Sequence, residues 1–334
     1  MARRSALQAR RSRFWKEKTA FDLIVDLTER GTWPMARSVL RGRLFGRAGK
    51  PPPVAVDAVA ASGPRTPRAE PPRSDGTAIP RVIFQTWKER QPLPANYHYW
   101  SASFSALNPG YAHILWDDAD NREFIAGTFP WFLPVYDSYP REIFRVDMVR
   151  PFFLYTFGGI YVDLDTECLR PIDETIGQGD VILGTMGLDT QFAHSVPNAI
   201  MASKPRQLFW LLAVANALER AGLCTTPADF IKRPEFFTAC ILIRDSLAQY
   251  QSMSEAEVRA YVSRRLPAEV PVEQAMAGQV RLLPSEAWFP INWNNLWQQR
   301  FRRDLLESRR LLTPEQVREL FPASHMVTYW THSW

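Results

Sequence analysis

The segment that most constrains the fold is a short apolar run that ends in two aspartates, Phe157-Gly-Gly-Ile-Tyr-Val-Asp163-Leu-Asp165. Residues i and i+2 of an extended chain point to the same side, so Asp163 and Asp165 project together, with their Cα atoms roughly 6.6 Å apart. Gly158 and Gly159 either allow a tight turn before the strand or leave room for a close ligand. The segment therefore predicts a buried strand whose end holds a hard divalent cation and a diphosphate. The alternative is that both aspartates only end a strand at the surface.

Other runs rich in β-branched and aromatic residues predict three more strands, over 82–86, 112–116 and 181–183. Leucine and alanine residues that recur every three or four positions predict a helix over 208–218. The capping-box spacing at Ser254 and at Thr313 predicts two further helix starts. Strands that alternate with helices favour an open α/β sheet, whose ligands bind beyond the carboxyl ends of the strands.

Basic residues are concentrated at the N-terminus. Residues 1–50 carry 13 Lys and Arg against 4 Asp and Glu, a balance of +9, and residues 51–78 carry three of each sign. Because the whole chain has a formal net charge of +5, residues 79–334 sum to −4. The main body is therefore mildly acidic, which argues against nucleic-acid binding by most of the chain.

The basic segment also contains apolar residues at roughly helical spacing, and Trp15 lies among its arginines. Such a segment can bind an anionic membrane surface, with about 1 kcal/mol per basic residue close to the lipid. The alternatives are a solvated tail and non-specific nucleic-acid binding through residues 1–50. Residues 51–78 are rich in proline and indicate a linker. We therefore predict a basic, proline-rich tail over 1–78 and a folded domain over 79–334.

The number and spacing of the cysteines indicate the cellular compartment. Cys168, Cys224 and Cys240 form no CxxC pair and are odd in number, which disfavours a disulfide framework or a zinc knuckle. No stretch approaches the roughly 18 apolar residues of a membrane-spanning helix, and no apolar region follows the basic start. We expect a cytoplasmic protein that binds peripherally at the inner membrane face through residues 1–50.

Four blocks in a fixed order carry a family resemblance: Ile79–Trp87, Asn108–Tyr111 with Leu115–Asp118, Arg145–Arg150, and Leu154–Asp165. Together they resemble glycosyltransferase family 32, the DXD sugar-binding-region enzymes. Members include yeast initiating mannosyltransferases, inositol-phosphorylceramide mannosyltransferases and bacterial capsular polysaccharide transferases. The resemblance implies a GT-A-like α/β fold with an open, mainly parallel sheet flanked by helices. It also implies a retaining, metal-dependent hexosyltransferase that uses a GDP- or UDP-hexose donor and a glycan or lipid-linked acceptor.

The resemblance assigns roles to individual residues. Asp163 and Asp165 would be the catalytic residues and would hold Mn²⁺ or Mg²⁺, which neutralises charge on the leaving diphosphate. The donor sugar and its phosphate would contact Asp147, Arg150, Gly159 and Asn198. The nucleotide would bind Gln85, Thr86, Trp87, Ser333 and Trp334. His332 would be a third metal ligand, with His325 as the alternative.

Structural alternatives accompany some of these roles. Asp147 and Arg150 also have the i,i+3 spacing of a helical ion pair, which is worth only a few tenths of a kcal/mol at a surface. Trp87 has the alternative of an ordinary core aromatic. Pro151 directly follows Arg150, so we expect the helix to start or kink there.

Two other function classes fit parts of the sequence. The first is a nucleotide-sugar-binding protein that keeps the fold and has lost turnover. The second is an Asp-x-Asp phosphatase of the haloacid-dehalogenase type. The phosphatase fits less well, because Thr166 follows Asp165 immediately and no Asp-Asp pair comes later in the chain.

Overall fold

The computed structural model describes residues 69–292 except 73, 90, 91, 178, 190, 191 and 224–233, and then 295, 298, 300, 302, 303 and 312–331. These residues fall into two units, which are described separately. The larger contains the described residues of 69–291 and 325–331, and the smaller contains those of 292–324. Most of the predicted tail lies outside the described residues, as do Cys224, His332, Ser333 and Trp334. The predicted division at residue 78 stays a prediction.

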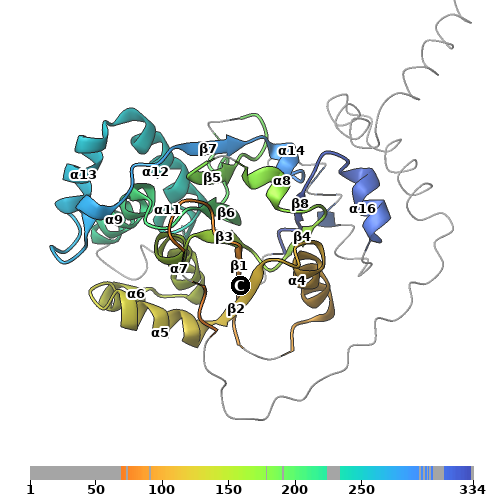
Figure 1. The fold of residues 1–334 in the computed structure, drawn as a ribbon, viewed down its shortest axis with the longest axis horizontal. Helices are drawn as coiled ribbons and strands as arrows, with labels where there is room; N and C mark the ends of the chain where they lie inside the picture. The colour runs from red at the N-terminus through yellow and green to blue at the C-terminus, as the bar shows by residue number, and fades with distance from the viewer. Residues whose placement is uncertain are drawn as a thin grey trace, which may run out of the picture. The chain divides into compact units, whose positions relative to one another are not determined.

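The larger unit is built on a sheet of six described strands in the order β2-β1-β3-β6-β5-β7 (Figure 1). Their bounds are β1 Val82–Trp87, β2 Ala112–Asp117, β3 Gly159–Val162, β5 Val181–Gly184, β6 Ile200–Ser203 and β7 Val280–Leu283. Among these six, β6 alone is antiparallel, and it pairs with β3 and β5. A second sheet pairs β4 (Thr166–Cys168) with β8 (Met326–Thr328). The predicted open, mainly parallel sheet is confirmed.

Helices flank the sheet (Figure 1). In the larger unit they are α4 Ala95–Leu107, α5 Asp118–Thr128, α6 Leu133–Ser138, α7 Glu142–Phe157, α8 Asp173–Ile176, α9 Leu208–Gly222, α11 Pro234–Phe237, α12 Cys240–Ser252, α13 Glu255–Ser263, η2 Val272–Gln274 and α14 Ser285–Trp288. The smaller unit contains α16 Pro314–Leu320. The predicted helix over 208–218 is confirmed as part of α9, and both predicted capping boxes form, at Ser254 and Thr313. In the part of the chain that the structure describes, no helix has the length and apolarity needed to cross a membrane.

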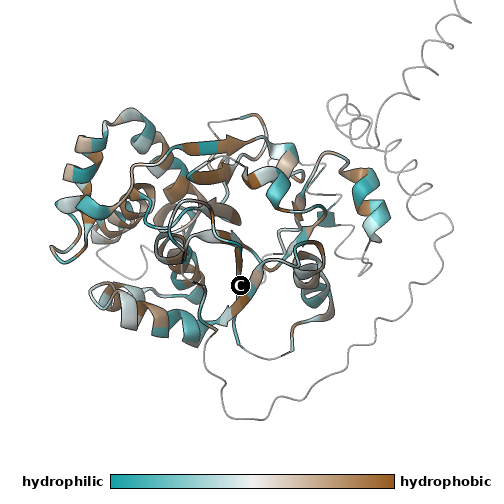
Figure 2. Ribbon diagram, viewed as in Figure 1, coloured by the Kyte–Doolittle hydropathy of each residue, from teal (hydrophilic) through white to brown (hydrophobic). Residues whose placement is uncertain are grey.

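Strands β3, β5 and β6 are buried along their whole length and β1 up to Trp87, whereas the edge strands β2 and β7 are partly exposed. Buried parallel strands need apolar side chains on both faces, which explains their continuous apolar runs. Figure 2 shows the strands mostly in brown, with polar residues along α5 and α13. The order of the strands brings the carboxyl ends of β1, β2 and β3 to one edge of the sheet.

Aromatic rings fix α7 against this sheet. Phe84 of β1 stacks on Phe153 of α7 with ring centroids 5.1 Å apart, and Trp116 of β2 lies 4.5 Å from Phe153 edge to face. Burial of such a side chain contributes about 1.5–3 kcal/mol relative to exposure. Of the two expectations at Pro151, a helix start is wrong, because α7 continues through this residue from Glu142 to Phe157, whereas a kink stays a prediction. Burial of the residues on both sides of the proline holds the helix together.

The two glycines between α7 and β3 have a structural reason. Gly158 has φ +66° and Gly159 has φ +90°, the left-handed region that side chains disfavour. A Cβ on Gly159 would lie 2.7 Å from the carbonyl oxygen of Val82, and one on Gly158 would lie 2.8 Å from that of Ser203. The glycines therefore let the chain leave the helix and enter the sheet between β1 and β6. For Gly159, the close packing of β3 against β1 is sufficient to explain the glycine, and no contact with a donor sugar is needed to explain it.

Candidate functional site

Asp163 lies directly after β3, at the carboxyl edge of the sheet. Its Oδ1 accepts hydrogen bonds from Arg150 Nη2 at 2.9 Å and from the Tyr161 hydroxyl at 2.8 Å. Burial raises the pKa of Asp163 to about 7, and Arg150 opposes this shift whereas Asp165 adds to it. The carboxylate is thus largely enclosed and held by two donors.

Arg150 joins Asp163 to two more of the predicted residues. Its Nη1 lies 3.2 Å from Asp147 Oδ1 and donates to the carbonyl oxygen of Asn198 at 3.1 Å. Asn198 Nδ2 in turn donates to Asp147 Oδ1 at 2.9 Å. The side chain of Arg150 is only 2% exposed, and its guanidinium lies 4.6 Å from the centre of the Tyr161 ring. Four predicted residues therefore form one connected network.

The environment of Asp147 shows what kind of ion pair it forms with Arg150. Thr238 Oγ1 lies 3.3 Å from Asp147 Oδ2, so both carboxylate oxygens have partners within the protein. Burial raises the pKa of Asp147, and Arg150 opposes the shift. Because both side chains are enclosed, the pair is a buried ion pair and not a surface one. Removing one partner of such a pair costs about 3–5 kcal/mol.

Asp165 is held by the returning C-terminal segment. Its Oδ2 accepts hydrogen bonds from the backbone nitrogen of Thr331 at 2.7 Å and from Thr331 Oγ1 at 2.9 Å. The hydroxyl of Tyr97, on α4, lies 2.8 Å from the same Oγ1. The ring of Tyr97 lies 4.8 Å from that of Trp87 at the end of β1. The predicted Trp87 is thereby linked to Asp165 through two residues that the sequence did not single out.

Sequence reasoning missed Tyr97 and Thr331 for different reasons. Thr331 directly precedes the predicted residues His332, Ser333 and Trp334, and this position next to them was the available signal. Tyr97 belongs to a 13-residue helix without a pattern that distinguishes it from its neighbours. Its contact with Thr331 joins positions 234 residues apart.

The remaining predicted residues lie in different surroundings. Gln85 is buried, and its Oε1 accepts a hydrogen bond from Ser101 of α4 at 2.6 Å and lies 2.7 Å from His113 Nε2. Thr86 Oγ1 lies 3.5 Å from the Tyr161 hydroxyl, and so borders the Asp163 network. His325 Nδ1 lies 3.7 Å from Glu174, before β8 and away from Asp165.

The two carboxylates suit a hard cation. Neither Asp163 Oδ2 nor Asp165 Oδ1 accepts a hydrogen bond from the described residues, so each aspartate keeps one oxygen for a ligand. Carboxylate oxygens are the ligands that Mg²⁺ and Mn²⁺ prefer. Among the described residues, no group of three or more His, Cys, Asp or Glu side chains is placed to hold a metal. Mg²⁺ is commonly bound by one or two carboxylates together with substrate phosphates and water, and this donor set fits that pattern.

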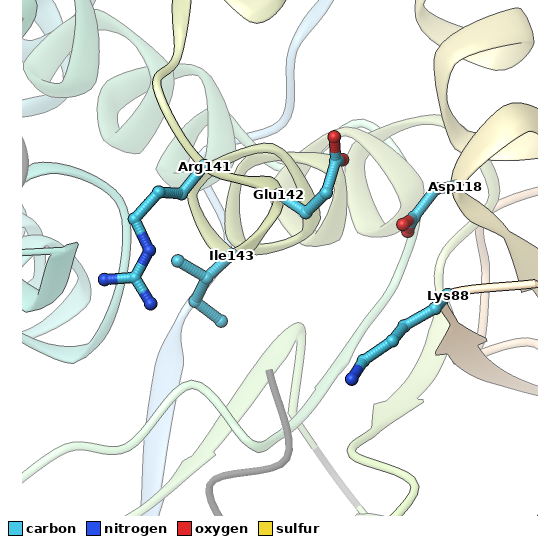
Figure 3. Close-up of a pocket in the computed structure, with 5 residues that line it drawn as sticks. All are labelled: Lys88, Asp118, Arg141, Glu142 and Ile143. Carbon is cyan, nitrogen blue, oxygen red and sulfur yellow. The ribbon is translucent and has the colours of Figure 1, made fainter.

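A pocket of 280 Å³ lies beside the ends of β1 and β2. Lys88 and Asp118 line one side of it. Arg141, Glu142 and Ile143, at the N-terminal end of α7, line the other side (Figure 3). Two strand spacings, about 10 Å, separate β2 from β3 and its Asp163. The pocket and the Asp163 network therefore lie at the same edge of the sheet.

Asp118 is the unsatisfied group of this pocket. Asp117 and Asp120 form the capping box of α5, which leaves the Asp118 side chain out of the cap. Its buried Oδ1 has no hydrogen-bond partner among the described residues. Burial raises the pKa of Asp118 to about 7, and Glu142 and Asp117 add to the shift. In the sequence, Asp118 is distinguished only as the last residue of the block Leu115–Asp118.

Residues 94–182 match the family model "Glycosyltransferase sugar-binding region containing DXD motif". Inositol phosphoceramide mannosyltransferase 3 of Schizosaccharomyces pombe is 48% identical over 100 residues, 30% of this chain and 28% of that protein. Mannosyl phosphorylinositol ceramide synthase SUR1 of Saccharomyces cerevisiae is 35% identical over 138 residues, 41% of this chain and 34% of that protein. The chain thus spans about a third of the length of these curated relatives.

A solved structure, PaToxG glycosyltransferase, covers 59% of this chain and 80% of its own chain, with 15% identity and a TM-score of 0.37. At that score the likeness carries no argument. The family model matches the segment that contains Asp147, Arg150, Asp163 and Asp165. The predicted resemblance is confirmed: residues 94–182 match the model of glycosyltransferase sugar-binding regions that contain a DXD motif.

Proposed function

We propose that this protein is a glycosyltransferase that moves a hexose from a nucleotide sugar to a glycan or lipid-linked acceptor. The observation that carries the proposal is the pair Asp163 and Asp165 at the carboxyl edge, each with one oxygen left for a ligand. The buried Arg150 network behind them supports it. Because one of these relatives is named a mannosyltransferase and the other a mannosyl phosphorylinositol ceramide synthase, we propose mannose as the hexose, transferred with retention as the family resemblance implies.

Asp163 and Asp165 would hold Mn²⁺ or Mg²⁺. Such a cation, when bound, neutralises the charge that develops on a leaving diphosphate. Arg150 and Tyr161 both donate to Asp163 Oδ1, so they fix this carboxylate and direct its other oxygen to the ligand. Asp147 and Asn198 hold Arg150 in turn. The network therefore holds the donor site in one arrangement before the substrate arrives.

We further propose that the pocket beside Trp87 receives the base of the donor, and that the base is guanine. Guanine presents two adjacent N–H donors, which a carboxylate oxygen attracts, and a carbonyl oxygen that suits an ammonium group. Asp118 and Lys88 line one side of the pocket with these two groups, and Ile143 provides an apolar wall. Uracil offers a single N–H between two carbonyls, which a carboxylate would repel. The volume of 280 Å³ exceeds the roughly 150 Å³ that accommodates a benzene ring.

Calorimetry would test the donor site directly. GDP and UDP are titrated with and without Mn²⁺ into the wild type and into the Asp163→Asn/Asp165→Asn variant. We expect Mn²⁺-dependent binding of GDP that the double variant loses. Equal binding of both nucleotides would contradict the guanine assignment, and no nucleotide binding by a folded sample would contradict the donor site.

Turnover distinguishes an enzyme from a binding protein of the same fold. Release of GDP from GDP-mannose is measured with glycolipid and glycan acceptors, for the wild type and for Asp165→Asn. Turnover that the variant loses supports the transferase. Binding of the donor with no release of GDP by any acceptor would support the binding protein.

The membrane interaction of residues 1–50 stays a proposal that rests on the sequence. These residues lie outside those that the structure describes. Their charge of +9 would draw them to an anionic surface, close to a lipid-linked acceptor. Co-sedimentation with phosphatidylglycerol vesicles should be lost at 0.5 M salt or so and on removal of residues 1–50. Sedimentation that is independent of both changes would contradict it.

A further inference from the structure

The carboxylate of Asp165 has a dedicated support. Thr331 donates to Asp165 Oδ2 twice, through its backbone nitrogen at 2.7 Å and through Oγ1 at 2.9 Å. Because Oγ1 has one proton, its contact of 2.8 Å with Tyr97 is one in which the tyrosine hydroxyl donates. The order Tyr97, Thr331, Asp165 thus forms a directed chain of hydrogen bonds from α4 to the carboxylate.

The segment that carries Thr331 is anchored separately. Strand β8 pairs with β4, and the backbone nitrogen of Tyr329 donates to the carbonyl oxygen of Asp165 at 2.9 Å. The Tyr329 hydroxyl donates to buried Glu167 at 2.6 Å, and its ring stacks on Trp100 at 4.6 Å. These contacts would hold the segment in place even without the side chain of Thr331.

The backbone turn before Thr331 is strained. Trp330 has φ +52°, a region that a bulky residue rarely adopts. Its indole nitrogen donates to the carbonyl oxygen of Ile291 at 2.9 Å, and its ring stacks on Phe289. These contacts sustain the turn, which brings the next residue to Asp165. Strained residues that are held in place by several surrounding contacts are frequent at functional sites.

We propose that Thr331 and Tyr97 are positioning residues that hold the carboxylate of Asp165 with Oδ1 directed to the bound cation. The proposal rests on the proposed metal-dependent transferase. Two hydrogen bonds at Oδ2 fix the rotation of the carboxylate, so that its free oxygen needs no reorientation when the ligand binds. The C-terminal segment 325–331 is then part of the metal–diphosphate site, although more than 150 residues separate it from the Asp-x-Asp pair.

The experiment is a titration of Mn²⁺ alone, followed by the electron paramagnetic resonance signal of the free ion, into the full chain. Thr331→Val removes the hydroxyl and keeps the shape, whereas Thr331→Ser keeps the hydroxyl. Tyr97→Phe removes only the hydroxyl that orients Thr331. Tyr250→Phe is the matched control, because it deletes a hydroxyl that donates to the carbonyl oxygen of Gly278 at 2.9 Å, outside this chain of bonds.

We expect Thr331→Val to weaken Mn²⁺ binding about 10-fold or more, the usual effect of losing a group that orients a metal ligand. Tyr97→Phe should weaken it about 5-fold, and Thr331→Ser and Tyr250→Phe should bind as the wild type does. Thermal unfolding is recorded for each variant, so that the comparison is made between folded samples. A Thr331→Ser variant as weak as Thr331→Val would contradict the hydroxyl's role.

Asp165→Asn separates the two hypotheses. If Asp165→Asn loses Mn²⁺ binding while Thr331→Val and Tyr97→Phe retain it fully, the positioning proposal is wrong and the metal site stands. If the wild type binds no Mn²⁺, or Asp165→Asn binds as well as the wild type, the metal site itself is wrong and the positioning proposal falls with it.

Discussion

Arg150 Nη2 lies 2.9 Å from Asp163 Oδ1, and the arginine that makes this contact is almost entirely enclosed. The cost of burying the charge of a guanidinium must be offset by nearby acceptors. Asp147 and the carbonyl oxygen of Asn198 provide these acceptors on its other side. Arg150 therefore joins helix α7, the start of β6 and the end of β3 at one point. The stability of the fold and the orientation of Asp163 depend on the same side chain.

We predict that Arg150→Met destabilises the protein by about 3–5 kcal/mol, because it leaves Asp147 and Asp163 without their cation. Urea denaturation at pH 7 measures the change in the free energy of unfolding. In the Arg150→Met/Asp147→Asn double variant the loss should be smaller than the sum of the two single losses, since one buried charge is then removed. Additive losses would show that the two residues are not coupled.

Gly159→Ala should destabilise the protein by more than about 2 kcal/mol, because the new Cβ combines a left-handed backbone with a clash against Val82. Gly127→Ala is the control. Gly127 lies in α5 with no described atom within 4 Å of an added Cβ, so alanine there should be neutral or should stabilise by roughly 0.5–1 kcal/mol. Thermal and urea unfolding of both variants test the pair. An unaffected Gly159→Ala would contradict the close packing of β3 on β1.

Asp118→Asn should weaken GDP binding about 10- to 100-fold and leave UDP binding little changed, because it removes a charged acceptor for the guanine N–H groups. Asp137→Asn, at an exposed ion pair with Arg122, is the matched control and should bind as the wild type does. Isothermal titration calorimetry measures both. Equal losses for GDP and UDP would point to a general effect on the site.

The pKa of Asp118 predicts a pH dependence of the same interaction. Burial raises this pKa to about 7, so the carboxyl is protonated below that pH and ionised above it. Only the ionised form accepts both N–H donors, and GDP affinity should therefore rise as the pH increases from 6 to 8. The ratio of wild-type to Asp118→Asn affinity removes the titration of the phosphates from the comparison. A ratio that stays constant over this range would contradict the assignment.

Chelation should stop the transferase. We expect EDTA to abolish release of GDP from GDP-mannose, and excess Mn²⁺ to restore it, because Asp163 and Asp165 each keep one carboxylate oxygen for a cation. Turnover that persists after exhaustive chelation would show that the two carboxylates act without a metal ion.

Much of the fold could be predicted from local patterns. The apolar run before Asp163 fixed a buried strand, and the spacing at Ser254 and Thr313 fixed two helix starts, because these signals lie within a few residues of one another. The predicted helix start at Pro151 is wrong for the same reason. Its local tendency to end a helix is outweighed by the packing of its neighbours in the core, which no local pattern reveals.

The candidate site was only partly accessible to such reasoning. The family resemblance singled out Asp147, Arg150 and Asn198, and the structure joins them to Asp163. The resemblance gave no indication that Arg150 is buried. The bond between Tyr97 and Thr331 depends on how the last strand returns to β4. Such contacts arise from topology, and a single sequence carries no local signal for them.

The reversal of β6 has a consequence for how such a protein can diversify. Strand β5 reaches the ligand edge and β6 departs from it, so both ends of the connecting segment 185–199 are held by paired strands at that edge. Leu188 lies in this segment and is 96% exposed. Lengthening such a surface loop adds little free energy, about 0.6 kcal/mol per doubling, and shifts no register in the sheet. The length of this connection can therefore change around Leu188 while Asn198, later in the same segment, keeps its contacts with Arg150 and Asp147.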